Sequence, residues 1–82
     1  MEKIIKIGNV ELYESEAMQY YQENKYIVTY SHIYQLFYSA AQKTVYGNSI
    51  YHCKGMTKRG RFYVFDGKEV NRLVKADLVK VD

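Results

Sequence analysis

The stretch SHIYQLFYSAAQKT, residues 31–44, decides how this sequence is expected to fold. Its apolar side chains follow the spacing i, i+3, i+4, i+7 and i+8, at Ile33, Leu36, Phe37, Ala40 and Ala41. This spacing predicts an amphipathic helix with one buried face. Thr29 or Ser31 is positioned to cap its start, and the pair Gly47-Asn48 ends the region.

The other face of this expected helix is polar and free of acids. A helix turns by about 100° per residue, which places four side chains on that face: Gln35, Tyr38, Ser39 and Gln42. His32, Tyr34 and Lys43 lie at its margins. The sequence therefore predicts a polar helix surface that an anionic partner can approach.

Short elements are expected before this helix. KIIKIGNVELY, residues 3–13, predicts a strand, a turn at Gly8-Asn9 and a second extended piece. Ser15 is a candidate cap for a short helix that ends near Asn24, because Asn tolerates the left-handed conformation.

A basic loop is expected after it. SIYHCK, GMTKRG and RFYVF, which together span residues 49–65, predict a strand, a loop and a strand. Gly55 and Gly60 supply permissive turn conformations. The resulting β-hairpin carries four cations at or beside its tip, namely Lys54, Lys58, Arg59 and Arg61.

The last segment, DGKEVNRLVKADLVKVD at residues 66–82, has two interpretations. Asp66-Gly67 is a hairpin signal, which would make residues 68–74 a strand and residues 49–81 a four-stranded meander. Asp66 followed by Glu69 also resembles a capping box, and Val70, Leu73 and Val74 have helical spacing. We favour the helix, ending near Ala76, with DLVKV extended.

Length and composition set the broad class. The 82 residues are expected to form a single domain, residues 1–82, without a linker or second domain. No apolar run is long enough to cross a membrane, and the start of the chain does not resemble a signal peptide. One cysteine, Cys53, cannot form an internal disulfide. These features predict a cytoplasmic protein with no membrane partner.

The charge distribution points to a polyanionic partner. Residues 26–65 contain no Asp or Glu and carry a net charge of +5, whereas residues 1–25 carry −2 and residues 66–82 balance. Acidic groups repel phosphate, so a surface that contacts nucleic acid is expected to exclude them.

The pieces SEAMQYY, VTYSHIYQLFYSA and KRGRFYVFDGKEVNRLV together resemble the small winged-helix excisionases and MerR-like DNA-binding proteins of phages and mobile elements. The resemblance implies an α+β fold, a small winged helix-turn-helix with a short N-terminal hairpin, two helices, a basic β-hairpin wing and a C-terminal helix. It also implies sequence-specific binding of double-stranded DNA, as an excisionase or a transcriptional regulator, without catalysis.

On this interpretation the site residues divide into two groups. The candidates for base-edge contacts are Gln35, Tyr38 and Gln42, because Gln pairs with adenine edges and Tyr can touch a thymine methyl. The candidates for phosphate contacts are Ser39, Lys43, Lys54, Lys58, Arg59 and Arg61. The expected target is A/T-rich duplex DNA, bound by a homodimer or a tandem array.

Two other partners remain open. Tyrosines recur every four residues at Tyr26, Tyr30, Tyr34 and Tyr38, and a tyrosine-rich helix edge suits a protein partner. Such a module would inhibit a host protein or a nucleoprotein complex. Alternatively, Tyr51, Phe62 and Tyr63 would stack on the bases of single-stranded nucleic acid.

Catalysis and metal binding are not expected. His52 and Cys53 are adjacent, His32 lies far away in the sequence, and the chain has no Cys-x-x-Cys motif. Cys53 is expected to be buried in a strand. The sequence therefore predicts no catalytic residue, no metal, no cofactor and no enzyme activity.

Overall fold

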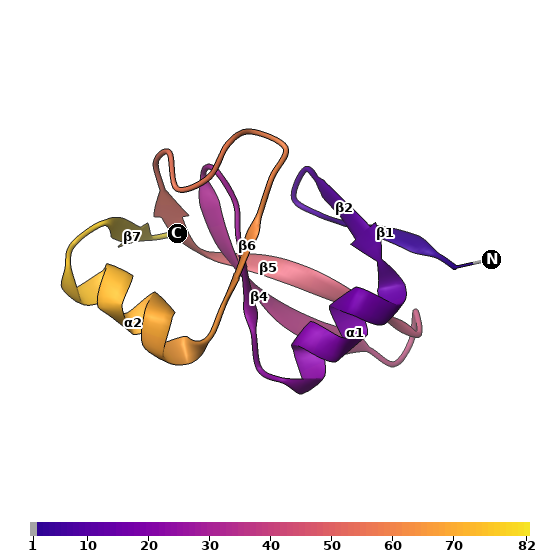
Figure 1. Cartoon of the computed structure of the whole chain (residues 1–82). Helices are drawn as coiled ribbons and strands as arrows, with labels where there is room; N and C mark the ends of the chain where they lie inside the picture. The colour runs from indigo at the N-terminus through magenta and orange to yellow at the C-terminus, as the bar shows by residue number, and fades with distance from the viewer. Residues whose placement is uncertain (1) are drawn as a thin grey trace.

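The computed structural model describes residues 2–82 and shows an α+β molecule with two helices (Figure 1). In chain order the elements are β1 (Ile4–Ile7), β2 (Val10–Tyr13), α1 (Glu14–Gln22), β3 (Tyr26–Val28), β4 (His32–Ser39), β5 (Thr44–Cys53), β6 (Tyr63–Phe65), α2 (Gly67–Lys75) and β7 (Val79–Val81).

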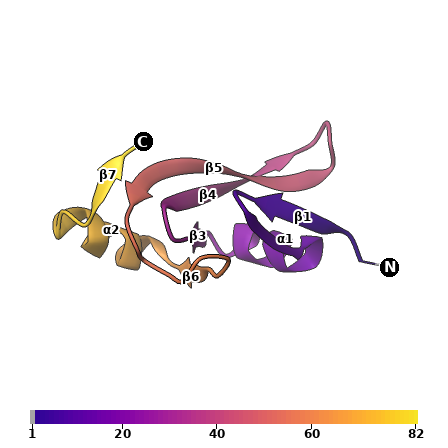
Figure 2. The same cartoon turned by 90° about the horizontal axis from the view of Figure 1, so that it is seen from above.

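Five of the strands form one antiparallel sheet in the order β6-β3-β4-β5-β7, and β1 and β2 form a separate hairpin. The pairing of β4 with β5 is interrupted at one point, where Tyr34 pairs with Ser49 and Ile33 with Tyr51. Ile50 is therefore an extra residue in β5, a β-bulge that increases the local twist. In Figure 2, β5 curves from the turn after β4 to the end that pairs with β7.

The sheet is buried on both faces, by a different helix on each. Neighbouring residues of β3 belong to different cores: Ile27 packs with α1 and the β1–β2 hairpin, and Val28 packs with α2. Because successive strand residues point to opposite faces, the two cores lie on opposite sides of the sheet. Figure 1 accordingly shows β6 passing between α2 and α1.

Two glycines allow the β1–β2 hairpin to approach the sheet. Gly47 lies on β5 under Ile7, and a Cβ atom there would sit 2.7 Å from Ile7 Cγ2. Gly8 turns the hairpin with a φ of 62° against the ring of Tyr34. Gly47 is thus a strand residue needed for close packing, and the prediction that Gly47-Asn48 ends the preceding element was wrong.

The winged helix-turn-helix prediction was wrong, chiefly at residues 31–44. This stretch forms β4, a turn and the first residue of β5, within a five-stranded sheet. Thr29 does hydrogen-bond like a cap, since its Oγ1 accepts the His32 N–H at 3.1 Å. However, the Thr29 N–H also donates to the His32 carbonyl at 2.8 Å, which closes a β3–β4 turn instead of starting a helix. Aromatic and β-branched residues in β4 favour the strand.

The basic hairpin wing is also absent within the described residues 2–82. The two strands that flank the basic loop, β5 and β6, do not pair with each other, because β3 and β4 lie between them. By contrast, α1 and α2 form where helices were expected, and residues 79–81 are extended. Since α2 is helical, the four-stranded meander was wrong as well.

Candidate nucleic-acid interface

The basic segment at residues 54–62 is a loop that crosses from β5 to β6 and is tied to the β3–β4 turn. The N–H of Gly55 donates to the Tyr30 carbonyl at 3.0 Å, and the N–H of Cys53 donates to the Ser31 carbonyl at 2.9 Å. Met56 packs against the core on the α2 side. These contacts fix the base of the loop to the sheet.

The tip of the loop is a tight turn. The Arg61 N–H donates to the Lys58 carbonyl at 3.0 Å, and Gly60 has a φ of 81°. A positive φ at this third position is typical of a type II turn, for which Gly is favoured. The hydroxyl of the buried Thr57 lies 3.0 Å and 3.1 Å from the carbonyl oxygens of Lys58 and Arg61. The tip is therefore held from inside while its charged side chains face solvent.

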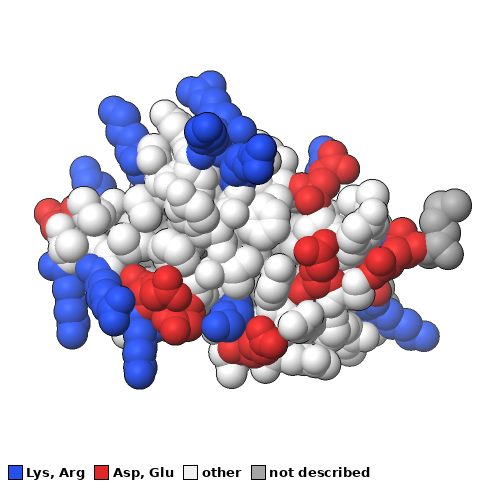
Figure 3. All heavy atoms as spheres, in the orientation of Figure 1, with Lys and Arg blue, Asp and Glu red and all other residues white. Residues whose placement is uncertain are grey.

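Four exposed cations gather on this loop, which we call the basic loop: Lys54, Lys58, Arg59 and Arg61. The guanidinium of Arg59 lies over the Tyr30 ring, 5.1 Å from its centroid, in a cation–π contact. Figure 3 shows basic side chains crowded at the top of the molecule, where Figure 1 places the basic loop. Acidic side chains lie instead around α1 and the β1–β2 hairpin, and a further group lies over α2.

Two hollows of about 320 Å³ each flank the tip. One is lined by Asn9, Tyr30, Ser31, Arg59, Gly60 and Arg61, and the other by Thr57, Lys58, Arg61 and Tyr63. Over the described part of the chain, no carboxylate lines either hollow. Both hollows therefore suit a phosphate oxygen beside an aromatic ring.

The aromatic residues near the loop are only partly available. Tyr63 is 48% exposed and stacks on Phe65 with centroids 5.6 Å apart. Phe62 packs against the α1-side core and Tyr51 against the α2-side core. Of the three predicted stacking residues, the structure presents Tyr63 to solvent at the basic loop. It adds Tyr30, which the sequence assigned to a helix edge for a protein partner.

The predicted base-reading residues lie away from the basic loop. Gln35, Tyr38 and Ser39 are on β4, and Gln42 and Lys43 are in the turn that joins β4 to β5. That turn is at the opposite end of β5 from the basic loop. The structure thus separates the predicted site into two groups and does not bring Gln35 and Gln42 onto one helix face.

The four regularly spaced tyrosines do not form the predicted helix edge. Tyr34 and Tyr38 are on β4, while Tyr26 is on β3 and Tyr30 is in the turn between these strands. Tyr38 instead pairs with Tyr21 of α1, with ring centroids 6.3 Å apart. A protein partner therefore stays a prediction, and the tyrosine-rich helix edge on which it rested does not form.

A larger hollow of about 570 Å³ lies below the basic loop. It is lined by Tyr30, Ser31, His52, Cys53, Lys54, Arg59, Asp77, Leu78, Val79 and Lys80. The Cys53 thiol is buried, as predicted, and burial raises its pKa. A raised pKa keeps the thiol protonated and therefore poorly nucleophilic.

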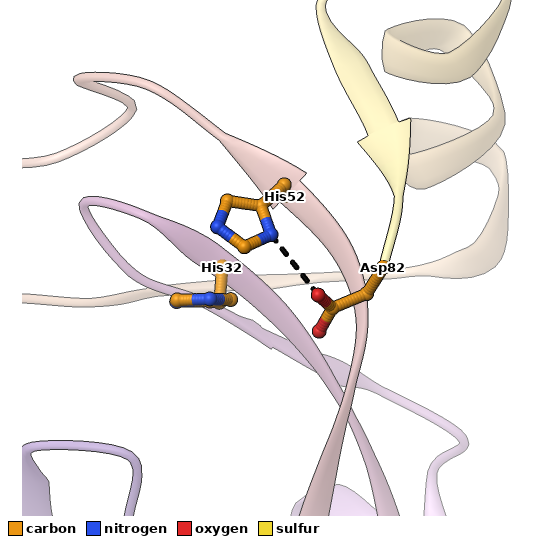
Figure 4. A group of neighbouring side chains, drawn as sticks. All are labelled: His32, His52 and Asp82. Carbon is orange, nitrogen blue, oxygen red and sulfur yellow. Dashed lines mark hydrogen bonds and ion pairs between the residues drawn. The ribbon is translucent and has the colours of Figure 1, made fainter.

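His32 and His52, which are far apart in the sequence, are neighbours beside this hollow. His32 on β4 and His52 on β5 are cross-strand partners, and their ring centroids are 4.3 Å apart (Figure 4). His52 Nδ1 lies 3.0 Å from Asp82 Oδ1. The Ser49 hydroxyl, and then His52, hold the pKa of Asp82 below its usual value. A regular hairpin centred on residues 40–43 would place His32 opposite Tyr51, and the β-bulge at Ile50 shifts the register by one residue, which brings His52 opposite His32 instead.

The described helices include none that is both long and apolar enough to cross a membrane. In comparisons with known proteins, no family model, no curated protein and no solved structure matched this chain.

Proposed function

We propose that this protein binds single-stranded nucleic acid through the basic loop and the tyrosines beside it. The observation that carries the proposal is the pair of hollows at the tip, in which cations and tyrosine rings meet without a carboxylate. Single-strand binders combine a positive groove, which follows the backbone, with aromatic rings on which bases stack.

The two parts of the surface have separate tasks. Lys58, Arg59 and Arg61 surround the tip and neutralise phosphates, and Lys54 extends the charge toward β5. Tyr63 offers its exposed ring to a base, with Phe65 stacked behind it. The turn that holds the tip orders the cations before binding, which reduces the entropy lost on association.

The arrangement favours a single strand over the A/T-rich duplex expected from sequence. Reading a duplex in its major groove requires an inserted helix or ribbon, and residues 31–44 supply a strand inside the sheet. A ring can stack only on an unpaired base. The proposal is for a cytoplasmic binding protein without a catalytic step; duplex preference is an outcome of the test below.

The test measures affinity for a labelled oligothymidine strand, and for mixed and A/T-rich duplexes, across a salt series. Each phosphate contact on a single strand contributes a slope of about −0.7 in log affinity against log salt, so four cations predict a slope near −3. Replacing Lys58, Arg59 and Arg61 with Gln should reduce the magnitude of the slope by about 2. An unchanged slope would remove the basic loop from the interface.

Lys43→Gln is the matched control. Lys43 is also an exposed cation in a turn, but at the opposite end of β5. This variant should leave the slope for the single strand unchanged. Tighter binding of duplex than of oligothymidine would overturn the single-strand assignment and favour the duplex partner.

A further inference from the structure

His32, His52 and Asp82 form a compact group of potential metal ligands. Each residue offers one ligand atom, and these atoms all lie within 4.8 Å of one another. The chain contains only two histidines, and the fold brings both of them to this one place. Figure 4 shows them on neighbouring strands, with Asp82 reaching toward His52 from the end of β7.

The surrounding structure orients the ligands. The Ser31 hydroxyl lies 2.7 Å from His32 Nδ1, which fixes the ring and leaves Nε2 free to bind. His52 is held by the β5 ladder, with Lys80 as its cross-strand partner on β7. The side chain of His52 is 57% exposed and that of Asp82 is 30% exposed, so an ion can enter from solvent.

We propose that His32, His52 and Asp82 bind a divalent transition metal ion, with Zn²⁺ as the best match. Two imidazoles and one carboxylate are a ligand set that zinc accepts, with a fourth position open. Ligands about 2.0–2.1 Å from a tetrahedral ion lie about 3.3 Å apart. The His52–Asp82 separation of 3.0 Å is close to this value. The ligand atoms lie up to 4.8 Å apart, so binding would require side-chain rotation to bring them closer.

One of the three ligands, His52, has mostly cationic neighbours. His52 lines the 570 Å³ hollow together with Lys54, Arg59 and Lys80, and Asp77 supplies one carboxylate there. An anionic fourth ligand, such as hydroxide or a phosphate oxygen, would therefore be favoured over a neutral one. None of the three metal ligands belongs to the basic loop, so binding of the ion can be tested without nucleic acid.

The test is a calorimetric titration of the protein with Zn²⁺ in phosphate-free buffer, without nucleic acid. One ion per chain should bind and raise the thermal midpoint of unfolding. His32→Ala and His52→Ala should each weaken binding at least tenfold, and Asp82→Asn should weaken it as well. Asp77→Asn is the matched control, because it removes a nearby carboxylate outside the cluster and should leave affinity unchanged.

A second measurement does not depend on variants that fold. In the unaltered protein, both imidazole signals in the NMR spectrum should shift together as Zn²⁺ is added. Co²⁺ should bind without a thiolate charge-transfer band, since Cys53 belongs to the core on the opposite face from His52. No binding, a shift of only one imidazole, or full affinity in the double variant His32→Ala/His52→Ala would overturn the proposal.

Discussion

The two faces of the sheet are covered by different helices, and they leave different residues uncovered. On the face that packs against α1, the strands continue past the helix to His32, His52 and Lys80. On the face that packs against α2, they continue to Phe37 and Tyr46, which stack with centroids 5.6 Å apart. One uncovered end is therefore polar and charged, and the other is aromatic.

This difference shows that solvent exposure alone does not make a site in this protein. Tyr46 and Tyr63 are exposed to similar extents, 40% and 48%. Tyr63 shares a hollow with Lys58 and Arg61, whereas Tyr46 stacks on Phe37. The proposed nucleic-acid interface and the proposed metal site both lie toward the end of the sheet where β5 leads into the basic loop.

The largest expected effect is on stability and compares two residues on the same face. Ile33 is fully buried under α2, whereas Phe37 lies beyond it. Ile33→Ala should lower the free energy of unfolding by about 2–5 kcal/mol. Phe37→Ala should lower it by less than Ile33→Ala does, because the half-buried Phe37 ring loses its pair with Tyr46, worth about 0.5–1.5 kcal/mol, and only part of a buried area. Urea unfolding followed by circular dichroism measures both, and equal losses would contradict the division into covered and uncovered halves.

The same division explains why residues 31–44 looked helical. In a strand, positions three apart point to opposite faces. Ile33 is buried on the α2 side and Leu36 on the α1 side. A strand buried on both faces therefore produces the i, i+3 spacing that predicts a helix when the strand is read alone.

Local signals, by contrast, were sufficient for α2 and for the β1–β2 hairpin. Asp66 and Glu69 form the predicted capping box, with the Glu69 N–H donating to Asp66 Oδ1 at 2.8 Å. The basic loop was also predicted, because its glycines and cations are contiguous. The separation of β5 from β6 depends on strand order, and the meeting of the two histidines depends on the β-bulge at Ile50 that shifts the β4–β5 register; no short segment encodes either.

A smaller effect is expected on binding, where Tyr63 is compared with Tyr46. Tyr63→Leu should weaken binding to oligothymidine by about 1–3 kcal/mol, the usual value of one stacked base. Tyr46→Leu removes a ring of similar exposure from the aromatic end and should leave this affinity unchanged. Fluorescence anisotropy at constant salt measures both. If the two variants behaved alike, Tyr63 would not be a stacking residue.

The smallest expected effect is on the acid dependence of helix stability, and it distinguishes the start of α2 from the start of α1. The Glu69 N–H holds the pKa of Asp66 below its usual value, and Lys25 adds to this. At the start of α1 the N-cap residue, Tyr13, carries no carboxylate, and Glu16 reaches back to its N–H at 3.3 Å.

Acid should therefore loosen α2 through Asp66. The pKa of Asp66 is lower in the folded state than in the unfolded state, so the ionised carboxylate stabilises the fold. This stabilisation is fully present above the unfolded-state pKa of about 3.9, and it is lost as pH falls through the folded-state pKa. Asp66→Asn keeps an oxygen acceptor but removes the charge, and it should flatten this dependence. Amide exchange at residues 70–75, compared with residues 17–22 between pH 6 and pH 3, measures the difference. An identical pH profile in Asp66→Asn would show that another group controls the acid response of α2.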